Sequence, residues 1–560
     1  MARTRLFDLL RRSYRLRRSA HEAGEPVAEH TERLREAYWS RRRLLRTGAT
    51  VGAGALVVPW QGCGDASGSP VAIVGAGLAG LVCAHRLAQA GLAADVFEAW
   101  NRTGGRTFTA RGMLEGDQIC ELGGELIDTG HTVMQDLASE LGLTLDDLAA
   151  PELTDTFYFG ARAVPESELS ASFAPVADRI ARQLEATFEL DAMGEPTAAA
   201  AAAFMRLDTT SLRAWLEDPA SGADATIRSV LDVAYTGEFG LPSDEQSVLN
   251  LMYLVDYESP DPFRIFGDSD ERFHLHEGSS SICEALTALY EAQIQLEHKL
   301  VAVREGSGGK VKLVFEAGAS TIEREYEQVV LTVPFTTLRD VTIDLPLSPE
   351  KRTLIDELGY GQNAKLMMQT RARPWRDAMR SGAGFAEGGA QTFWDSARGQ
   401  DGAQGILTHF AGGDDGIALG TGTPESHADR VAALLEPIFP GFGASRNGRV
   451  LRMHWPSQEH FRGSYACYRP GQWAIGGLEG VTEAGDRLYF AGEHTSIESQ
   501  GYMEGAAETG QSAAQAILAA RGLTRRSEML VSAGLVRPSA QRGVRSALRV
   551  VADAARRARR

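Results

Sequence analysis

The sequence has only five cysteines in 560 residues, and they are spread widely: Cys63, Cys83, Cys120, Cys283 and Cys467. An odd, scattered set does not build a disulfide framework. Without a C-x-x-C pair or a neighbouring histidine cluster, the set also indicates no zinc site. We therefore expect no bound metal, and we expect most of these cysteines to be small buried hydrophobic residues.

The apolar run near the amino terminus, TGATVGAGALVVPW (47–60), is too short to be a membrane helix, which needs roughly 18–20 residues. It follows the segment SRRRLLR (40–46), which resembles the bacterial twin-arginine export signal. We expect residues 1–68 to be a leader and the protein to be periplasmic or extracellular. The alternative is an arginine-rich surface helix on a cytoplasmic protein.

Basic residues are scarce outside the two ends of the chain. The formal charge is -17, yet residues 1–46 carry 13 Arg against 6 acids and residues 521–560 carry 11 Arg against 2. The ends are therefore +7 and +9, and the body between them is about -33. Such a body repels nucleic acid and makes a cationic small substrate plausible.

The basic tail, residues 523–560, contains a stretch with helical periodicity. Val544, Leu548 and Val551 fall on one face of that helix, with arginines around it. This pattern predicts weak contact with an anionic membrane surface. The alternative is a solvated tail.

A dinucleotide-binding pattern begins at residue 71, in VAIVGAGLAGLVCAHRLAQAGLAADVFEA. An apolar strand leads to Gly75, Gly77 and Gly80, then to an amphipathic helix and a second strand that ends at Glu98. The glycines permit a tight turn, close approach of a pyrophosphate and close helix packing. Glu98 is placed to accept hydrogen bonds from ribose hydroxyls. This arrangement predicts a Rossmann-type α/β domain.

The segments that follow resemble the flavin-containing amine oxidases, a family that includes monoamine, polyamine and L-amino-acid oxidases. NRTGGRT (101–107) follows Glu98, and ELGGELID (121–128), HEGSSSICEAL (276–286), LTVPF (331–335), RLYFAGEHTS (487–496) and GYMEGAAETG (501–510) follow in the family's order. The resemblance covers roughly residues 70–520. It implies bound FAD and a glutathione-reductase-like FAD domain with a discontinuous α+β substrate domain.

The resemblance also implies a division of the chain. The FAD domain takes residues 69–128, 271–345 and 451–522, and the substrate domain takes a helical part, 129–270, and a strand-rich part, 346–450. By the same resemblance the cofactor is contacted by Gly75, Gly77, Gly80, Glu98, Arg102, Gly105, Arg106, Gly123, Gly124, Leu300, Gly492, Glu493 and Met503. The oligomeric state stays open, with a homodimer as one alternative.

Three residues match the family's catalytic positions. Tyr465 and Tyr502 match the two walls of an aromatic cage in front of the flavin, which favours an amine through the electron-rich ring faces. Lys365, in YGQNAKLMM (360–368), matches the lysine that holds a water against the flavin. Its alternative is a solvated lysine at a strand end.

The stretch RGSYACYRPG (462–471) decides whether the flavin is covalently bound. Monoamine oxidases carry a flavin-linked cysteine just before the first cage aromatic, and Ser464 stands there in this chain. Cys467 lies three positions later, so an extended strand would turn it to the opposite face. We expect Cys467 to pack in the core and FAD to be noncovalent.

The resemblance predicts an FAD-dependent amine oxidase. Hydride leaves the carbon beside the amine for the flavin, and the products are an imine, hydrolysed to aldehyde or ketone, and hydrogen peroxide from oxygen. Glu125 and Asp128 are candidate anchors for a second ammonium of a diamine, against the alternative that they face solvent or bond to backbone. Trp394 and Phe410 are candidates for the substrate wall, against the alternative that they are core.

Two alternative functions remain. The first is an L-amino-acid oxidase, although the arginine that usually follows the Gly-Gly pair to bind a carboxylate is missing after Gly123-Gly124. The second is a flavoprotein scaffold without turnover. Retention of Lys365 and both cage tyrosines argues against the scaffold.

Overall fold

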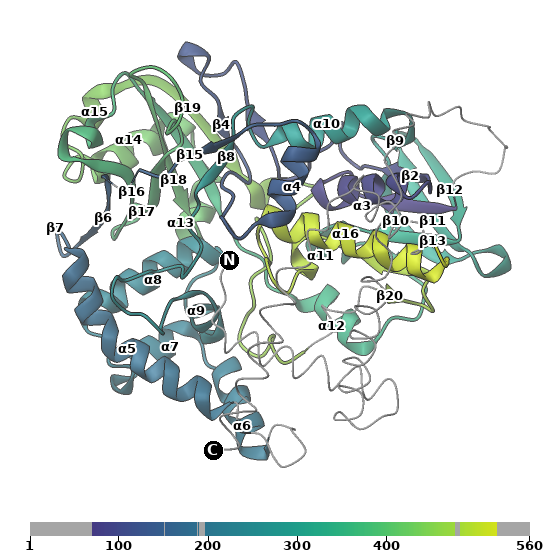
Figure 1. Ribbon diagram of the computed structural model, residues 1–560, viewed down its shortest axis with the longest axis horizontal. Helices are drawn as coiled ribbons and strands as arrows, with labels where there is room; N and C mark the ends of the chain where they lie inside the picture. The colour runs from purple at the N-terminus through teal and green to yellow at the C-terminus, as the bar shows by residue number, and fades with distance from the viewer. Residues whose placement is uncertain (1–69, 151, 188, 190–196, 476–481, 524–560) are drawn as a thin grey trace, which may run out of the picture.

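The computed structural model describes residues 70–523, except 151, 188, 190–196 and 476–481. Two lobes lie side by side (Figure 1). The first is built on a six-stranded sheet whose order is β20 (Thr482–Glu483), β21 (Leu488–Phe490), β13 (Gln328–Leu331), β1 (Val71–Val74), β2 (Ala94–Phe97) and β9 (Ile294–Gln295). β1 runs parallel to both of its neighbours and all four of its residues are buried. Its sequence, VAIV, is apolar on both faces, as a buried parallel strand requires.

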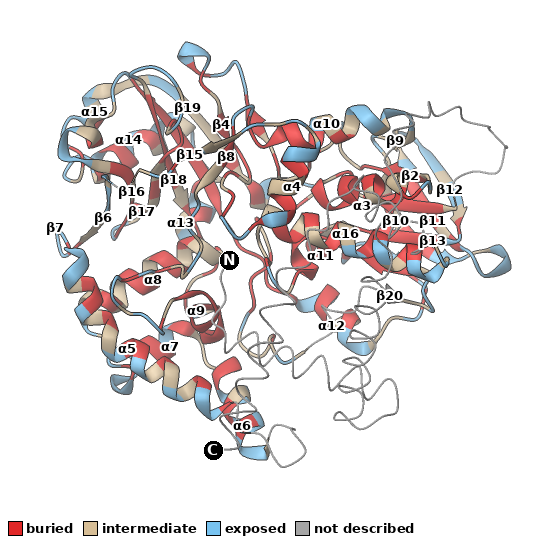
Figure 2. Cartoon of the chain, viewed as in Figure 1, coloured by how far each residue is buried: buried red, intermediate tan, exposed pale blue. Residues whose placement is uncertain are grey.

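Two long helices pack beside this sheet because small residues let their backbones approach closely. They are α3 (Leu78–Gln89), which is largely buried, and α16 (Met503–Ala520), which buries one face (Figure 2). A Cβ on Gly510 of α16 would lie 2.2 Å from the Ala79 carbonyl oxygen of α3, and a Cβ on Gly80 would lie 1.9 Å from the Gly75 oxygen. Any larger residue at either position would push the helix away. The apolar core of this lobe also includes α10 (Ser280–Tyr290) and α4 (Thr132–Glu140).

A second sheet extends the first lobe. Its order is β12 (Ser320–Tyr326), β11 (Val311–Ala317), β10 (Lys299–Glu305) and β14 (Thr342–Ile343). Short helices α11 (Phe335–Leu338) and α12 (Pro349–Glu357) follow β13 and β14 along the chain. Two further pairs of short antiparallel strands are β3 (Thr109–Ala110) with β4 (Cys120–Glu121), and β5 (Leu145–Asp147) with β8 (Phe273–Leu275).

The second lobe is built on a seven-stranded sheet. Its order is β19 (Arg446–His454), β15 (Ala364–Thr370), β18 (Gly405–Ala411), β17 (Gln391–Asp395), β16 (Arg380–Ala386), β6 (Thr154–Phe159) and β7 (Arg162–Ala163). The neighbouring strands β15 and β18 pair antiparallel, with Lys365 opposite Phe410. Helices α13 (Gly413–Ala418), α14 (Pro424–Leu435) and α15 (Phe442–Ser445) accompany this sheet.

The helical part of the second lobe is a separate apolar cluster below the sheet in Figure 1. It contains α5 (Glu166–Ala186), α6 (Ala198–Asp208), α7 (Leu212–Glu217), α8 (Ala225–Phe239) and α9 (Val248–Leu254). A side-chain oxygen caps the first turn of each of the last four helices, from Thr197, Ser211, Asp224 and Ser247. Such caps accept a backbone N–H that the helix itself leaves unpaired, so they fix where each helix starts.

Two searches of the described residues gave negative results. No helix in residues 70–523 combines the length and the apolar character needed to cross a membrane. No group of three or more His, Cys, Asp or Glu within the same residues could hold a metal ion. The leader 1–68 and the tail beyond residue 523 lie outside the described residues, so the predictions of export and of lipid contact stay predictions.

Candidate active site

A cavity of about 440 Å³ is lined by residues of both lobes. All the predicted site residues except two contribute to its wall. The predicted residues that line it are Gly75, Gly77, Glu98, Gly105, Arg106, Gly123, Gly124, Glu125, Asp128, Leu300, Lys365, Trp394, Tyr465, Gly492, Glu493, Tyr502 and Met503. Residues hundreds of positions apart in sequence therefore form one wall.

The dinucleotide end of the cavity is formed by the turn after β1. Gly75 has a φ of +107° and leads into α3, so the first helical N–H groups face the cavity. A methyl group on Gly105 would lie 3.3 Å from the Gly77 Cα atom, so the space between the two loops exists only because both residues are glycine. This narrow slot at a helix N-terminus fits a pyrophosphate.

Glu98 directly follows β2 and lines the same end of the cavity. Its Oε2 accepts the Ala76 N–H at 2.7 Å and its Oε1 accepts the Trp100 N–H at 2.8 Å. Burial raises the pKa of Glu98, and these backbone hydrogen bonds oppose that rise. A carboxylate oxygen accepts more than one hydrogen bond, so the group remains able to accept ribose hydroxyls.

Gly80 and Arg102 are the two predicted site residues that do not line the cavity. Gly80 acts through helix packing, as described above. Arg102 donates to the Thr103 and Gly105 carbonyl oxygens at 2.9 and 2.6 Å, and its contact with the cofactor stays a prediction. Its guanidinium also lies about 4 Å from the ring centres of Trp100 and Phe108. Arg102 therefore fixes the shape of the glycine loop.

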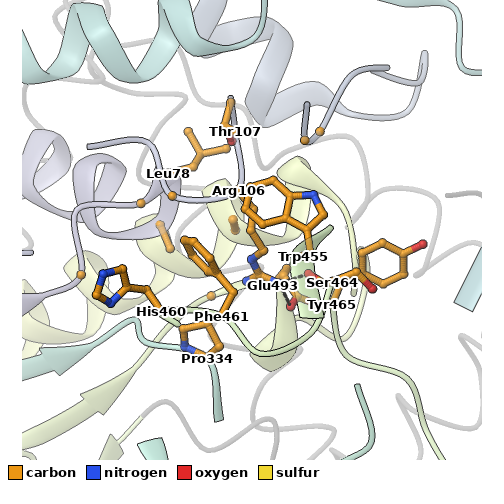
Figure 3. A pocket seen from close by; sticks show the side chains of 18 of the residues that line it. Leu78, Arg106, Thr107, Pro334, Trp455, His460, Phe461, Ser464, Tyr465 and Glu493 are labelled. Carbon is orange, nitrogen blue, oxygen red and sulfur yellow. Dashed lines mark hydrogen bonds and ion pairs between the residues drawn. The ribbon is translucent and has the colours of Figure 1, made fainter. Parts of the chain in front are cut away.

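Arg106, the second arginine of the loop, does reach the cavity. It donates to the Ser464 carbonyl oxygen at 2.6 Å and to Glu493 Oε1 at 2.8 Å (Figure 3). Glu493 also accepts the Gly501 N–H at 2.9 Å, immediately before α16. These three segments come from distant parts of the chain, and the Arg106–Glu493 ion pair joins them at the cavity wall.

The Gly123-Gly124 segment packs tightly against its neighbours. A Cβ on Gly124 would lie 2.7 Å from Met503 Cγ, and a Cβ on Gly123 would lie 1.7 Å from the Arg106 carbonyl oxygen. Larger residues are therefore excluded where the chain passes the cavity. The segment places Met503, the first residue of α16, at the wall.

Lys365 is buried, so the alternative of a solvated strand-end lysine is wrong. Its Nζ atom donates to the Gly123 and Glu121 carbonyl oxygens at 2.8 and 3.2 Å and to Glu125 Oε2 at 2.8 Å. The ammonium also lies 5.1 Å from the Trp394 ring centre. All three of its N–H bonds are engaged, so holding a water requires one of these partners to be exchanged.

Glu125 is engaged by Lys365 and Trp394, which differs from the expectation of a free substrate anchor. Its Oε1 accepts the Trp394 indole N–H at 2.9 Å, and its other oxygen pairs with Lys365. Burial favours the neutral acid, but the Lys365 charge and hydrogen bond prevail and hold the pKa of Glu125 below its ordinary value. Trp394 and Phe410 both line the cavity, with ring centres 5.6 Å apart.

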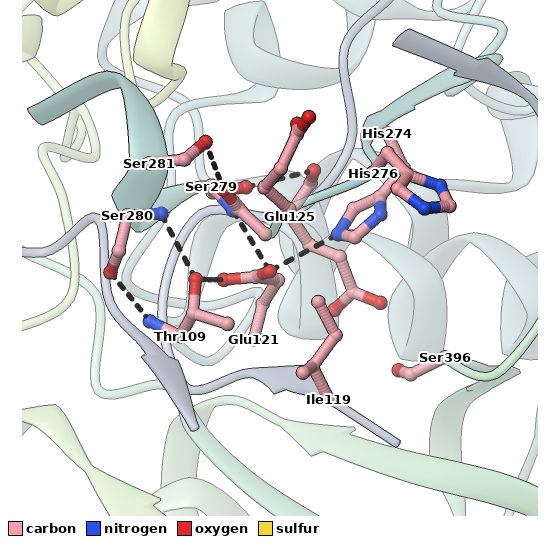
Figure 4. Close-up of polar contacts among 12 residues, drawn as sticks. Thr109, Ile119, Glu121, Glu125, His274, His276, Ser279, Ser280, Ser281 and Ser396 are labelled. Atoms are coloured by element: carbon pink, nitrogen blue, oxygen red, sulfur yellow. Dashed lines mark hydrogen bonds and ion pairs between the residues drawn. The ribbon is translucent and has the colours of Figure 1, made fainter. Parts of the chain in front are cut away.

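A buried polar cluster lies behind Lys365. Glu121 accepts hydrogen bonds from the Thr109 hydroxyl, the Ser279 N–H and His274 Nε2 (Figure 4). The backbone oxygen of Glu121 is one of the acceptors of Lys365. Burial lowers the pKa of His274, but the hydrogen bond and charge of Glu121, with the charges of Glu125 and Asp146, raise it above its ordinary value. Sequence reasoning did not single out Glu121 or His274.

The two cage tyrosines meet at one residue that the sequence did not reveal, Glu238 near the end of α8. The Tyr502 hydroxyl donates to Glu238 Oε1 at 2.8 Å, and the Tyr465 hydroxyl donates to the Glu238 carbonyl oxygen. Burial raises the pKa of both phenols. The Tyr502 ring also packs edge-on against His131, with ring centres 5.3 Å apart.

Carboxylates surround the cage. Asp128 lines the cavity, but its oxygens accept from the Ser269 hydroxyl and the Glu271 N–H at 2.8 and 3.0 Å. Glu238 and Glu271 line it as well. Burial, helped by the charge of Asp128, raises the pKa of Glu238 to about 7, although the Tyr502 hydrogen bond opposes this. Glu271 is exposed, and the like charges of Glu238 and Asp128 raise its pKa above the ordinary value. A cation between them would relieve this repulsion.

Cys467 packs in the core, as expected. The predicted cause, an extended strand that turns Cys467 away from Ser464, is wrong. Its segment is an irregular turn with one bridge, Tyr360 to Ala466, and not an extended strand. Ser464, Tyr465 and Ala466 line the cavity, whereas Cys467 is fully buried with its Sγ 3.6 Å from Asn250 Nδ2. Burial raises the pKa of its thiol. Within the described residues the other cysteines, Cys83, Cys120 and Cys283, are buried and unpaired too.

Comparison with known proteins places this site in a family. Residues 78–518 match the model of the flavin containing amine oxidoreductases, so the chain belongs to that family and is an FAD-dependent oxidoreductase. The expected fold class, a Rossmann-type FAD domain with a second substrate domain, is confirmed.

Individual relatives have different stated activities. The chain is 27% identical to a flavin-dependent L-tryptophan oxidase of Lentzea aerocolonigenes, covering 81% of this chain and 98% of that protein. It is 24% identical to the flavin-containing amine oxidase B of Sus scrofa, covering 81% and 86%. A solved structure of a putrescine oxidase bound to putrescine has a TM-score of 0.68 at 23% identity, covering 80% of this chain and 99% of that one, and shows the likeness of fold.

Proposed function

We propose that the chain oxidises primary or secondary amines, with FAD bound noncovalently and oxygen as the acceptor. The observation that carries the proposal is the arrangement of Tyr465 and Tyr502 on the cavity wall with Lys365, within a ring of carboxylates. Bound FAD supplies two-electron oxidation: hydride leaves the carbon beside the amine, the imine is hydrolysed to a carbonyl compound, and oxygen becomes hydrogen peroxide.

The chain's own residues bind and orient the substrate. The faces of Tyr465 and Tyr502 flank the amine and exclude water, and Trp394 and Phe410 supply the apolar wall for the carbon chain. Lys365 is held near the Gly123-Gly124 segment by its three hydrogen bonds. Its positive charge stands ready to stabilise negative charge beside the flavin ring.

The charges of the cavity support an amine over an amino acid. Each lysine or arginine that lines it is already in an ion pair: Arg106 with Glu493, Lys299 with Glu459, Lys365 with Glu125 and Arg462 with Asp340. No cation of the described wall is thus left unpaired to bind a substrate carboxylate. The Asp128 carboxylate, and Glu238 and Glu271 in their ionised forms, would instead repel it.

A second candidate function is L-amino-acid oxidation, and the likeness to the L-tryptophan oxidase favours it. A peroxide-coupled screen of the holoenzyme against monoamines, diamines and L-amino acids separates the two. Turnover of amines without turnover of amino acids supports the proposal. A preference for amino acids over every simple amine would replace it with the second candidate.

We also propose that the twin-arginine segment exports the folded holoenzyme. Replacing Arg41 and Arg42 with lysine keeps the charge but removes the arginine pair. The flavoprotein should then stay in the cytoplasmic fraction, and unchanged export of the variant would contradict the proposal.

A further inference from the structure

Glu238 contacts both cage tyrosines through different atoms. Its side-chain Oε1 accepts the Tyr502 hydroxyl at 2.8 Å, and its backbone oxygen accepts the Tyr465 hydroxyl. The two rings come from segments 37 residues apart, and α8, which ends at Phe239, comes from a third. One residue thus joins the two walls of the cage.

The end of α8 that carries Glu238 is fixed to the rest of the site. Gly240, with a φ of +76°, ends the helix, and its carbonyl oxygen accepts the Gln362 and Gly413 N–H groups at 2.8 and 2.9 Å. Asn363 donates to the Gly237 oxygen at 2.6 Å and accepts the Ser464 hydroxyl at 2.5 Å. The backbone of Glu238 is therefore held by the chain just before Lys365 and by the residue next to Tyr465.

We propose that Glu238 is a positioning residue that sets the separation of Tyr465 and Tyr502 and so determines how thick a substrate group fits between them. This inference rests on the proposed role of the two tyrosines as a substrate cage. Tyr465 is held by a backbone oxygen, which no side-chain substitution removes. Tyr502 is held by the carboxylate, so substitution of the side chain releases this ring alone.

A direct electrostatic role for Glu238 gives a different expectation. Within the described residues, Glu238 Oε2 has no hydrogen-bond partner, and the residue lines the cavity, so the carboxylate is placed where it could also meet a substrate ammonium. Glu238→Gln separates the two roles. The glutamine oxygen still accepts the Tyr502 hydroxyl, but the negative charge is gone.

The test uses a slim amine, n-butylamine, and a bulky amine, cyclohexylamine, to reduce the flavin of the holoenzyme. The ratio of the two kcat/KM values is then compared between each variant and the natural protein. Glu238→Ala and Tyr502→Phe should each shift the ratio about tenfold toward the bulky amine, the scale of one or two methylene groups in a pocket. The double variant should shift it no further, because both changes remove the same hydrogen bond. Glu238→Gln should stay within about threefold of the natural protein.

The matched control is Asp232→Asn, on the same helix. Asp232 accepts the Ser243 hydroxyl and does not line the cavity, so the ratio should not change. An unchanged ratio in Glu238→Ala, equal damage in Glu238→Gln and Glu238→Ala, or multiplied effects in the double variant would each overturn the positioning role.

Failure of the proposed function would look different. If no amine reduces the flavin of the natural protein, amine oxidation is wrong, and the same ratio is then measured with L-alanine and L-phenylalanine. A second readout needs no substrate: the unfolding free energies of the two single variants and the double variant should be non-additive. Additive values would contradict the Glu238–Tyr502 coupling whatever the substrate is.

Discussion

Lys365 and Glu125 form a buried ion pair, with Nζ 2.8 Å from Oε2 and side chains 6% and 7% exposed. The pair lies on the cavity wall between the Gly123-Gly124 segment and Trp394. Removing one charge from such a pair leaves the other buried without compensation. The catalytic candidate and its partner should therefore be coupled in stability as well as in activity.

Replacing Lys365 with methionine should slow flavin reduction or reoxidation by about tenfold or more while FAD stays bound. It should also lower the free energy of unfolding by roughly 3–5 kcal/mol, because Glu125 loses its cation. Stopped-flow absorbance measures the first effect and urea unfolding the second. The double variant Lys365→Met/Glu125→Gln should regain stability but not activity, and unchanged turnover in the single variant would show the assignment of Lys365 to be mistaken.

FAD should be released by acid precipitation of the protein. Ser464 occupies the position at which a cysteine would link the flavin, and Cys467 is fully buried outside the cavity wall. The yellow colour should appear in the supernatant with the absorbance of free FAD. Colour that stays with the pellet after washing would mean a covalent link at another residue.

Glu271→Gln should raise the KM for a diamine such as 1,4-diaminobutane about tenfold and that for n-butylamine by less than about threefold. The Glu271 carboxylate forms no hydrogen bond among the described residues, whereas the Asp128 oxygens are already engaged. We therefore predict that Glu271 contacts the second ammonium, in place of Asp128, which the resemblance to the amine oxidases had suggested. Steady-state kinetics on the holoenzyme measure both values.

The control for this prediction is Glu258→Gln, which removes an exposed acid that does not line the cavity. It should change neither KM value. If Glu271→Gln and Glu258→Gln raised the KM for the diamine equally, the effect would come only from the overall negative charge of the protein. A KM for the diamine that does not respond to Glu271→Gln would remove the subsite.

The stability that His274 contributes should depend on pH. Its folded pKa lies above the ordinary value of 6.5, so the folded state binds the proton more tightly. The contribution is therefore fully present below about pH 6.5 and is lost as the pH rises through the folded pKa. In His274→Asn it should be absent, so the difference in Tm between the natural protein and the variant should be largest near pH 6 and shrink toward pH 9. A difference that grows with pH would contradict the charged His274–Glu121 pair (Figure 4).

The sequence alone was enough to predict the class of fold, the cofactor and many of the residues that line the cavity. The glycines of the dinucleotide turn, Glu98 and the closing segment before α16 can be read directly, because each acts through backbone geometry that is local in sequence. The resemblance also located Lys365, Tyr465 and Tyr502, since each stands in a short motif.

Tertiary structure alone decided what these side chains bond to. Glu238 and Glu271 stand in no recognisable motif: Glu238 lies near the end of an amphipathic helix, and Glu271 lies in a loop. They reach the cavity wall only because α8 and the chain before β8 fold against it. Glu125 and Asp128 were correctly placed on the wall but are engaged by Lys365, Trp394, Ser269 and the Glu271 N–H. Arg102 donates to two carbonyl oxygens of its own loop. Sequence spacing gives the position of a charged group along the chain. The hydrogen-bond or ion-pair partner of that group comes from a distant segment, which reaches it only in the folded core, where a buried charge must be paired.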